Sequence, residues 1–323
     1  MTPQILTAAS AALALAMLGS CASSARSESP IARGDGPSVK VAGPTEIEPY
    51  KPLTTERQAI GYALAELDGS IQRWNSMVLT GSEVKDGQRV QYLEEAIRYR
   101  AQESFEGLVE QIETGPVINR QIAATALGFT GTADALAPLL AALLDRDDQV
   151  VANALLGLSV LGHPETPVEN IASKMSDRSQ PTSVRVNAGR ALRAIRVAHL
   201  QGEARAAVTG AARSGLGDEE PGVVMNSTLL LAELLDTDSI LAIAERLPHP
   251  SSNVARAASR SLAYLGSIEI TAKGPVVRAL VASLPHVDPR SVRPYVFQDL
   301  QRLAGKNYGD DVALWLKYAN SLP

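Results

Sequence analysis

Residues 147–162 read DDQVVANALLGLSVLG, and this stretch contains the pattern that decides the fold of the chain. Four apolar residues follow one another at spacings of four, four and three: Val150, Ala154, Leu158 and Leu161. Residues at these spacings lie on one face of an α-helix. Asp147 can cap the free N–H groups of the first turn, and Gly162 suits the left-handed conformation that often ends a helix. The stretch therefore predicts a short helix with one apolar face and defined ends.

The same pattern recurs six times along the chain. Its first leucine, called the repeat leucine below, falls at Leu127, Leu158, Leu192, Leu231, Leu262 and Leu300. The intervals are 31, 34, 39, 31 and 38 residues, which is the period of a two-helix repeat. Segments between these helices, such as 132–144 and 237–247, carry a single apolar stripe and are predicted to be the first helices of the pairs. Because such helices become stable only by stacking, the sequence predicts an all-α solenoid of about six to seven helix pairs.

Two stretches of the array, 147–162 and 252–266, resemble HEAT repeats of the short bacterial kind. The likeness covers about residues 115–305, and the stretch from Leu300 to Trp315 resembles a tail that often closes such arrays. The resemblance implies an α-solenoid that binds partners through an extended surface. It is specific for architecture and says little about activity.

Two longer apolar stripes, at residues 56–79 and 89–113, precede the array. The outermost repeats of a solenoid need a polar outer face, so we expect these two helices to cap its N-terminal end. The predicted domains are this helical cap over 55–114 and a solenoid with its own C-terminal cap over 115–323.

The chain starts with an apolar run, ILTAASAALALAML at residues 5–18, which suits the core of a signal peptide and is short for a membrane span. The run leads into residues 18–21, LGSC, which resemble the lipobox of bacterial lipoproteins. The resemblance implies a signal peptide over 1–20 and lipidation of Cys21, palmitate included, as the mature N-terminus. Ala22 stands where Asp typically marks retention in the inner membrane, so the resemblance favours the outer membrane in a cell with two membranes.

Residues 21–54 are rich in Ser, Pro and Gly and show neither helical nor strand periodicity. Segments with so few large apolar residues do not bury enough surface to fold. We expect a flexible tether that holds the folded part of the chain close to a membrane.

Composition and motifs exclude several classes of protein. Lys plus Arg is 30, Asp plus Glu is 35 and the net charge is −5, whereas proteins that bind nucleic acid are usually basic. Cys21 is the single cysteine, so the chain has neither an internal disulfide nor a thiolate metal cage. No familiar catalytic motif is present, and we expect no cofactor and no enzymatic activity. The alternative is an enzyme, because phycobilin lyases and some DNA glycosylases use HEAT-like arrays; the lyase type is the one retained, since a glycosylase conflicts with an exported, acidic protein.

Positive charge gathers in one part of an otherwise acidic chain. Residues 174–213 contain eight basic and two acidic side chains, a net charge of +6, which leaves −11 for the rest. Four arginines of this segment are the candidate binding residues: Arg185, Arg190, Arg193 and Arg196. On helical spacing, Arg190 and Arg193 lie roughly opposite the apolar stripe and would point into a concave surface. An acidic partner would be attracted there. A solvated basic face without a dedicated ligand is the alternative.

Asparagine occupies the same position, five residues before the repeat leucine, in three successive repeats: Asn153, Asn187 and Asn226. Stacked asparagines predict a structural ladder that hydrogen-bonds neighbouring backbone, although the position also borders the exposed face and could bind a partner. The combined hypothesis is a membrane-tethered scaffold or adaptor for another protein of the bacterial cell envelope. The alternatives are a HEAT-like lyase and a binder of an anionic envelope ligand.

Overall fold

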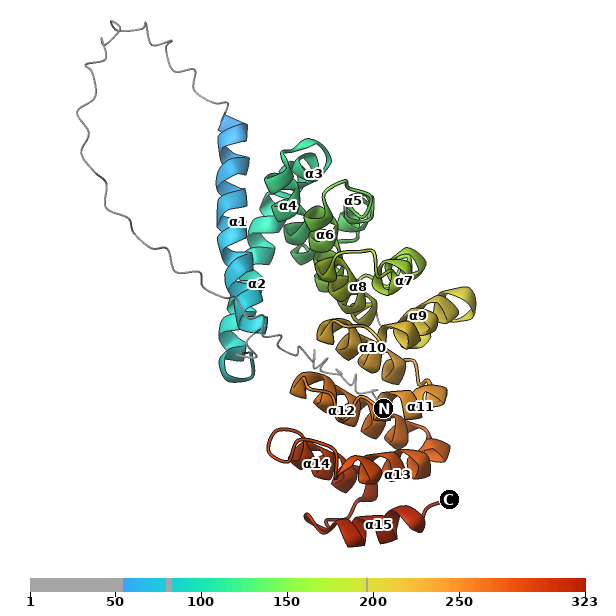
Figure 1. The fold of residues 1–323 in the computed structure, drawn as a ribbon. Coiled ribbons are helices and arrows are strands. Elements are labelled where there is room, and N and C mark those ends of the chain that lie inside the picture. The colour runs from blue at the N-terminus through green and yellow to red at the C-terminus, as the bar shows by residue number, and fades with distance from the viewer. Residues whose placement is uncertain (1–54, 80–82, 196) are drawn as a thin grey trace, which may run out of the picture.

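The computed structural model describes residues 55–79, 83–195 and 197–323, and within these ranges every regular element is a helix (Figure 1). The prediction of an all-α solenoid is therefore confirmed. The signal peptide, Cys21, the tether and Arg196 lie outside the described residues.

Helix pairs make up most of the described chain. Two helices precede them, α1 (Thr55–Leu79) and α2 (Glu83–Glu103), and α15 (Val312–Asn320) follows. The first helices of the pairs are α3 (Phe105–Thr114), α5 (Leu136–Ala142), α7 (Val168–Ser176), α9 (Gly202–Gly215), α11 (Ile240–Ala244) and α13 (Lys273–Ser283). The second helices are α4 (Val117–Phe129), α6 (Asp148–Leu161), α8 (Thr182–Ala194), α10 (Pro221–Glu233), α12 (Ser252–Ile268) and α14 (Arg293–Ala304). Short 3-10 turns lead into four of the first helices: η1 (Ala133–Ala135), η2 (Val197–His199), η3 (Thr237–Ser239) and η4 (Ile270–Ala272).

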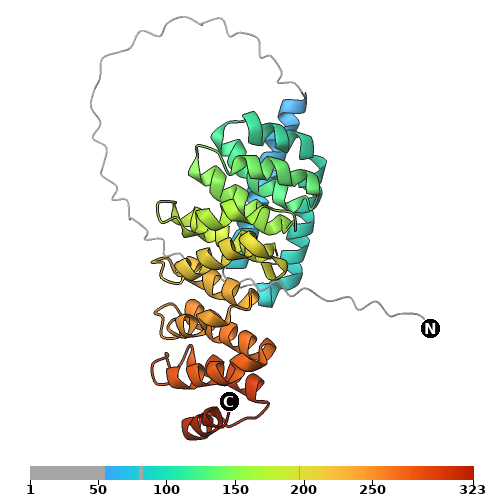
Figure 2. The ribbon, with the colours of Figure 1, turned by 90° about the vertical axis from the view of Figure 1, so that its right-hand side faces the viewer.

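The second helices pack against one another in chain order, from α4 on α6 to α12 on α14. The first helices lie behind them, so that each pair forms one layer of a stack (Figures 1 and 2). The row of second helices lies on the inner side of the bend in this stack (Figure 1). We call the solvent side of α4, α6, α8, α10, α12 and α14 the concave surface.

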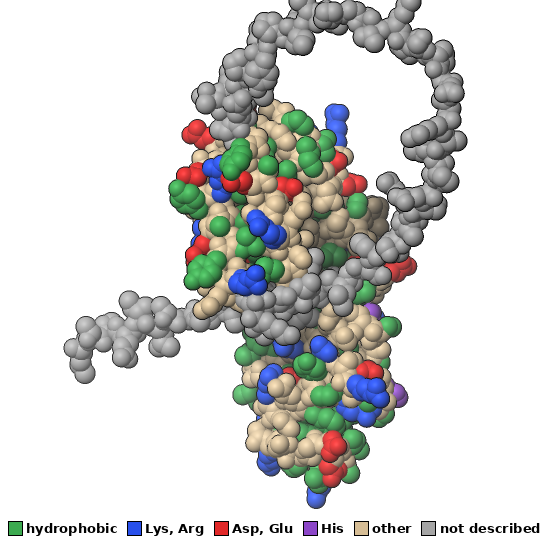
Figure 3. Space-filling model, turned by 90° about the vertical axis from the view of Figure 1, so that its left-hand side faces the viewer, with side chains coloured by type: hydrophobic (Ala, Val, Ile, Leu, Met, Phe, Trp, Pro, Cys, Tyr) green, Lys and Arg blue, Asp and Glu red, His purple; other side chains and the backbone are tan. Residues whose placement is uncertain are grey.

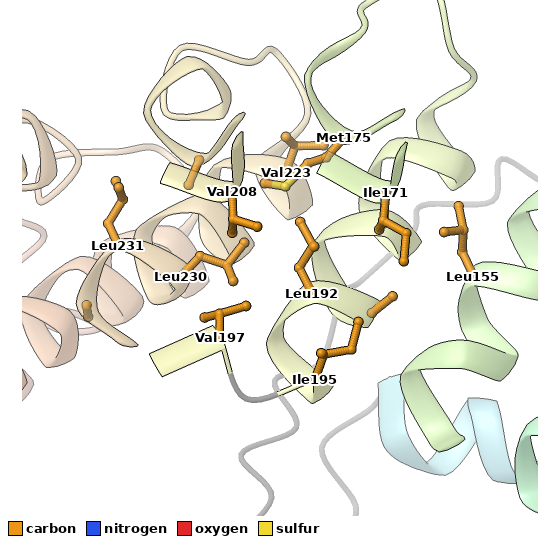
Figure 4. Close-up of a cluster of buried hydrophobic side chains, with 14 of the residues drawn as sticks. Leu155, Ile171, Met175, Leu192, Ile195, Val197, Val208, Val223, Leu230 and Leu231 are labelled. Atoms are coloured by element: carbon orange, nitrogen blue, oxygen red, sulfur yellow. The ribbon is translucent and has the colours of Figure 1, made fainter. Parts of the chain in front are cut away.

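The six repeat leucines all lie inside the core, and each of them has 0% of its surface exposed. Valines eight residues before five of these leucines are at most 2% exposed: Val150, Val184, Val223, Val254 and Val292. In the central repeats, Leu192 and Leu230 lie in a cluster of apolar side chains from α6, α7, α8, α9 and α10 (Figure 4). Complete burial of a leucine stabilises a fold by roughly 1.5–3 kcal/mol, so the periodic leucines account for a large part of the cohesion between layers.

Glycines allow two second helices to approach closely. A Cβ on Gly157 of α6 would lie 2.3 Å from the carbonyl oxygen of Ala124 in α4, which only glycine avoids. Gly162 ends α6 in the left-handed conformation expected from the sequence, with φ of 57°. Gly266, like Gly162, lies four residues after a repeat leucine, a position where the repeat pattern predicts a helix end; the structure instead places Gly266 inside α12. There the helix continues to Ile268, and a Cβ on Gly266 would lie 3.1 Å from Val276 of α13, so this glycine serves packing.

The N-terminal part of the structure differs from the expectation of two helices. The stripe at 89–113 is divided at Ser104 into α2 and α3. α2 packs beside α1 and against α4, whereas α3 pairs with α4 and reaches α5. One straight helix could not make both sets of contacts. Trp74 of α1 joins this part to the array, because its ring meets that of Phe129 edge to face at 5.0 Å.

Helix α15 covers the end of the last pair and packs on α13. Trp315 is completely buried there, and its Nε1–H donates to the carbonyl oxygen of Gly309 at 3.0 Å. The Tyr308 ring meets Trp315 edge to face at 4.9 Å. These contacts are those expected of a C-terminal cap.

Candidate binding surface

The three asparagines occupy equivalent places between successive second helices. Asn153 Nδ2 donates to the carbonyl oxygen of Gln121 at 2.8 Å, and Asn187 Nδ2 donates to that of Ala152 at 2.9 Å. Asn226 Nδ2 donates to the carbonyl oxygen of Val186 at 3.2 Å. Each accepting carbonyl lies six residues before the repeat leucine of the preceding repeat, so the bonds form a regular ladder. Such a bond typically contributes about 0.5–1.5 kcal/mol.

Arg185 lies between repeats. It forms an ion pair with Asp218, in the turn before α10, and the side chains of Arg185 and Asp218 are 11% and 5% exposed. Asp218 also accepts the backbone N–H of Glu220, the N-cap of α10, at 2.8 Å. Arg185 therefore fastens α8 to the next repeat and is largely withdrawn from the surface where sequence reasoning expected it.

The same type of arginine–aspartate ion pair joins the first two repeats. Arg120, like Arg185, lies seven residues before a repeat leucine and binds Asp145 through Nε at 2.8 Å and Nη2 at 3.1 Å. Asp145 accepts the backbone N–H of Asp147, the N-cap of α6, at 2.8 Å. We call each of these arginine–aspartate pairs a repeat clamp. Sequence reasoning missed both clamps, because each aspartate is far from its arginine along the chain.

Arg193 also reaches the next repeat. Its Nε lies 3.4 Å from Glu233 Oε1 and its Nη1 lies 3.4 Å from Asn226 Oδ1, both on α10. Burial raises the pKa of Glu233, and the charge of Arg193 opposes part of that rise. Arg193 is half-buried, and its charge is partly balanced within the fold.

One position of each second helix lies on the helix face opposite the buried repeat leucine, and in α10, α12 and α14 it lines the concave surface. The residues two places before the repeat leucines are Thr125, Leu156, Arg190, Leu229, Arg260 and Gln298, and we call them the inner row. Three members, Leu229, Arg260 and Gln298, line one pocket of about 200 Å³ between α10, α12 and α14. Since the repeats are equivalent, Arg190 occupies the corresponding place on α8.

Arg190 is half-buried and makes no hydrogen bond or ion pair with any residue in the described ranges. Burial, together with the neighbouring charge of Arg193, lowers the pKa of Arg190. A guanidinium stays charged in proteins in spite of such a shift. Arg190 is therefore a positive charge that the described fold does not compensate, and an anion bound beside it would be favourable.

The face that includes the concave surface carries Lys and Arg as well as Asp and Glu side chains among apolar and neutral ones (Figure 3). The four candidate arginines thus differ. Arg185 forms an ion pair with Asp218, Arg193 lies near Glu233, and Arg190 has no partner among the described residues. Arg196 is outside the described residues. Sequence reasoning missed Arg260, although it shares the repeat position of Arg190.

The described part of the chain also bears on metal sites and membrane-spanning helices. It holds no group of three or more His, Cys, Asp or Glu side chains that could bind a metal ion. None of its helices is both long enough and apolar enough to span a bilayer.

Comparisons with known proteins bear on the fold. No protein-family model matches the sequence, and no curated protein matches it. An engineered protein of known structure is similar to the chain with 19% identity and a TM-score of 0.50, over 83% of this chain and 74% of its own. A second engineered protein has 21% identity and a TM-score of 0.49, over 62% and 98% of the two chains. A designed armadillo repeat protein has 17% identity and a TM-score of 0.47, over 61% and 98%. At these identities the likeness concerns the helical repeat fold alone.

Proposed function

We propose that this protein is a scaffold or adaptor of the bacterial cell envelope that binds an acidic protein partner on its concave surface. The observation that carries the proposal is Arg190, a half-buried guanidinium without a counter-charge among the described residues. An unbalanced charge near a low-dielectric surface favours the binding of an opposite charge. The charge would also disfavour a basic partner, which it would repel.

The proposal includes an anchor, for which the sequence of the N-terminus is the support. The LGSC stretch at 18–21 follows a run suited to a signal peptide, and lipidation of Cys21 would attach the chain to a membrane. More than one acyl chain is needed for stable attachment. The outer membrane is favoured where the cell has two. The tether would then keep the concave surface within reach of a partner in the same membrane.

We further propose that the chain acts by binding and not by catalysis. A solenoid stacks separate layers, and the stack presents a long surface to its surroundings, which suits binding. The lyase-type alternative would require a bound cofactor or pigment, and the anionic-ligand alternative a small molecule beside Arg190.

The test is partner capture by crosslinking in native membranes with the full chain, followed by quantitative mass spectrometry. The variant Arg190→Gln removes the unbalanced charge. Arg146→Gln is the matched control, because Arg146 is exposed in the turn before α6 and its side chain makes no hydrogen bond or ion pair within the described residues. We expect Arg190→Gln to reduce recovery of one acidic protein about ten-fold or more and Arg146→Gln to leave it unchanged. Equal recovery with all three chains would contradict the proposal, and a small molecule recovered in place of protein would favour the alternatives.

A further inference from the structure

A basic pocket lies on the concave surface two repeats beyond Arg190. It has a volume of about 200 Å³ and contains three arginines, Arg256 and Arg260 of α12 and Arg302 of α14. Leu229 and Ala257, which are 7% and 3% exposed, contribute apolar surface to the same pocket. A site with an apolar floor and a basic rim suits an acidic group carried on a short hydrocarbon stem.

The first arginine of this pocket is held in place by its own surroundings. Arg256 Nε donates to the carbonyl oxygen of Ser291 at 2.9 Å. Its guanidinium lies 4.4 Å from the centre of the Tyr295 ring, in a cation–π contact. An arginine fixed in this way loses little conformational entropy when it binds a carboxylate.

The acidic residue of the pocket does not cancel its charge. Asp299 is 4% exposed, and its two oxygens accept bonds from Ser259 Oγ at 2.6 Å and Arg302 Nη1 at 3.2 Å. Arg260 is exposed and makes no hydrogen bond or ion pair with the described residues. Three guanidinium groups and this one carboxylate line the pocket, which leaves the pocket with net positive charge.

Resting on the proposed function, we propose that this pocket binds a second carboxylate side chain of the partner segment that binds at Arg190, and that this segment is extended. Arg190 and Arg260, neither of which makes a hydrogen bond or ion pair with the described residues, are the two arginines of the inner row and lie two repeats apart. Packed helices are about 8–10 Å apart, so the two guanidinium groups are separated by roughly 16–20 Å.

The spacing defines the partner segment. An extended chain rises about 3.3 Å per residue and presents every second side chain on one face, so about six residues cover the separation. The segment therefore carries Asp or Glu at positions i and i+6. Leu229 lies between Arg190 and Arg260 in the inner row and is apolar, so an apolar residue at i+2 or i+4 completes the pattern.

The test uses fluorescent synthetic peptides and the full chain, with affinity measured by fluorescence anisotropy. One peptide has glutamates at i and i+6 with leucine at i+4, and a second has the same composition with glutamates at i and i+3. The first peptide should bind about ten-fold more tightly than the second. Arg260→Gln should lower the affinity for the first peptide about ten-fold and leave that for the second nearly unchanged, whereas Arg146→Gln should alter neither.

The outcomes separate the two proposals. If Arg190→Gln weakens peptide binding and Arg260→Gln does not, the pocket is not part of the site, although the proposed function stands. Failure of every peptide to bind, or equal affinity for the two spacings, would overturn the extended-segment proposal, while partner capture through Arg190 would still test the function. Vesicles containing an anionic phospholipid are the remaining probe, and Arg260-dependent binding to vesicles without peptide binding would also overturn it.

Discussion

Single residues of one chemical type have different roles in this protein, and the array decides which. Arg185 and Arg120 lie at equivalent repeat positions and form the repeat clamps with Asp218 and Asp145. Arg190, five residues after Arg185, has no such partner in the described residues. The sequence indicated a basic segment correctly, but it could not distinguish these arginines, because the partner aspartates come from the following repeat. The asparagines were easier to interpret, since their position recurs with the period of the array.

The clamp at Asp145 predicts a pH dependence. Burial would raise the pKa of Asp145, but bonds from Arg120 and from the backbone N–H groups of Asp147 and Arg146 outweigh it, and the pKa is lowered. A carboxylate with a lowered pKa stabilises the fold above its unfolded pKa, and this contribution is lost as the pH falls through the folded value.

We therefore expect Asp145→Asn to lower the free energy of unfolding by about 1–3 kcal/mol at pH 7, because it breaks a partly buried ion pair. The difference from the parent chain should shrink as the pH falls below about 4. Urea denaturation from pH 7 to pH 2.5 measures both quantities. A difference that stays constant over this range would show that the carboxylate charge contributes nothing.

At the scale of helices, small residues set how closely successive layers stack. The sequence pattern located the second helices well because each contains a buried leucine and, in most repeats, a buried valine at fixed spacing. It did not locate the break at Ser104 or the extension of α12 past Gly266. Both features depend on which neighbouring helix a helix packs against. The spacing of apolar residues within one helix does not identify that neighbour.

Two glycines make a matched test of layer stacking. Gly157→Ala should lower the free energy of unfolding by about 1–3 kcal/mol or more, because the new methyl group would overlap the carbonyl oxygen of Ala124. Gly210→Ala in α9 should raise it by about 0.5–1 kcal/mol, since its Cβ would meet nothing within 4 Å and alanine favours a helix. Chemical denaturation of the two variants provides the comparison. Equal effects of the two substitutions would contradict close packing of α4 on α6.

At the scale of the whole molecule, the solenoid, the proposed anchor and the concave surface have separate tasks. The fold could be predicted from the sequence because the same apolar pattern recurs in every repeat. The regular repeats therefore identify the irregular ones. The binding surface followed only in part. A charge without a partner is visible only after the internal pairs have been assigned, and these pairs join residues from different layers.

The proposed lipid anchor predicts that the protein leaves the membrane when the sulfur atom of Cys21 is removed. Cys21→Ala removes the thiol that would accept the lipid, so the variant should leave the membrane fraction. The mature parent chain should begin with an acylated cysteine by mass spectrometry. Membrane association that is unchanged in Cys21→Ala would contradict the lipoprotein assignment, and the substitution should leave the helical content unaltered, as circular dichroism would verify.

The central claim is that a partner protein lies along the concave surface beside Arg190. The most direct measurement is site-specific photocrosslinking in native membranes, with the reactive residue placed at Gln298 of the inner row or at Leu241. Leu241 is 75% exposed on α11, a first helix on the opposite side of the stack. We predict that one acidic protein crosslinks from position 298 and not from position 241, and that Arg190→Gln removes the product. Crosslinking from position 241 alone, or a product at position 298 that persists in Arg190→Gln, would contradict the account.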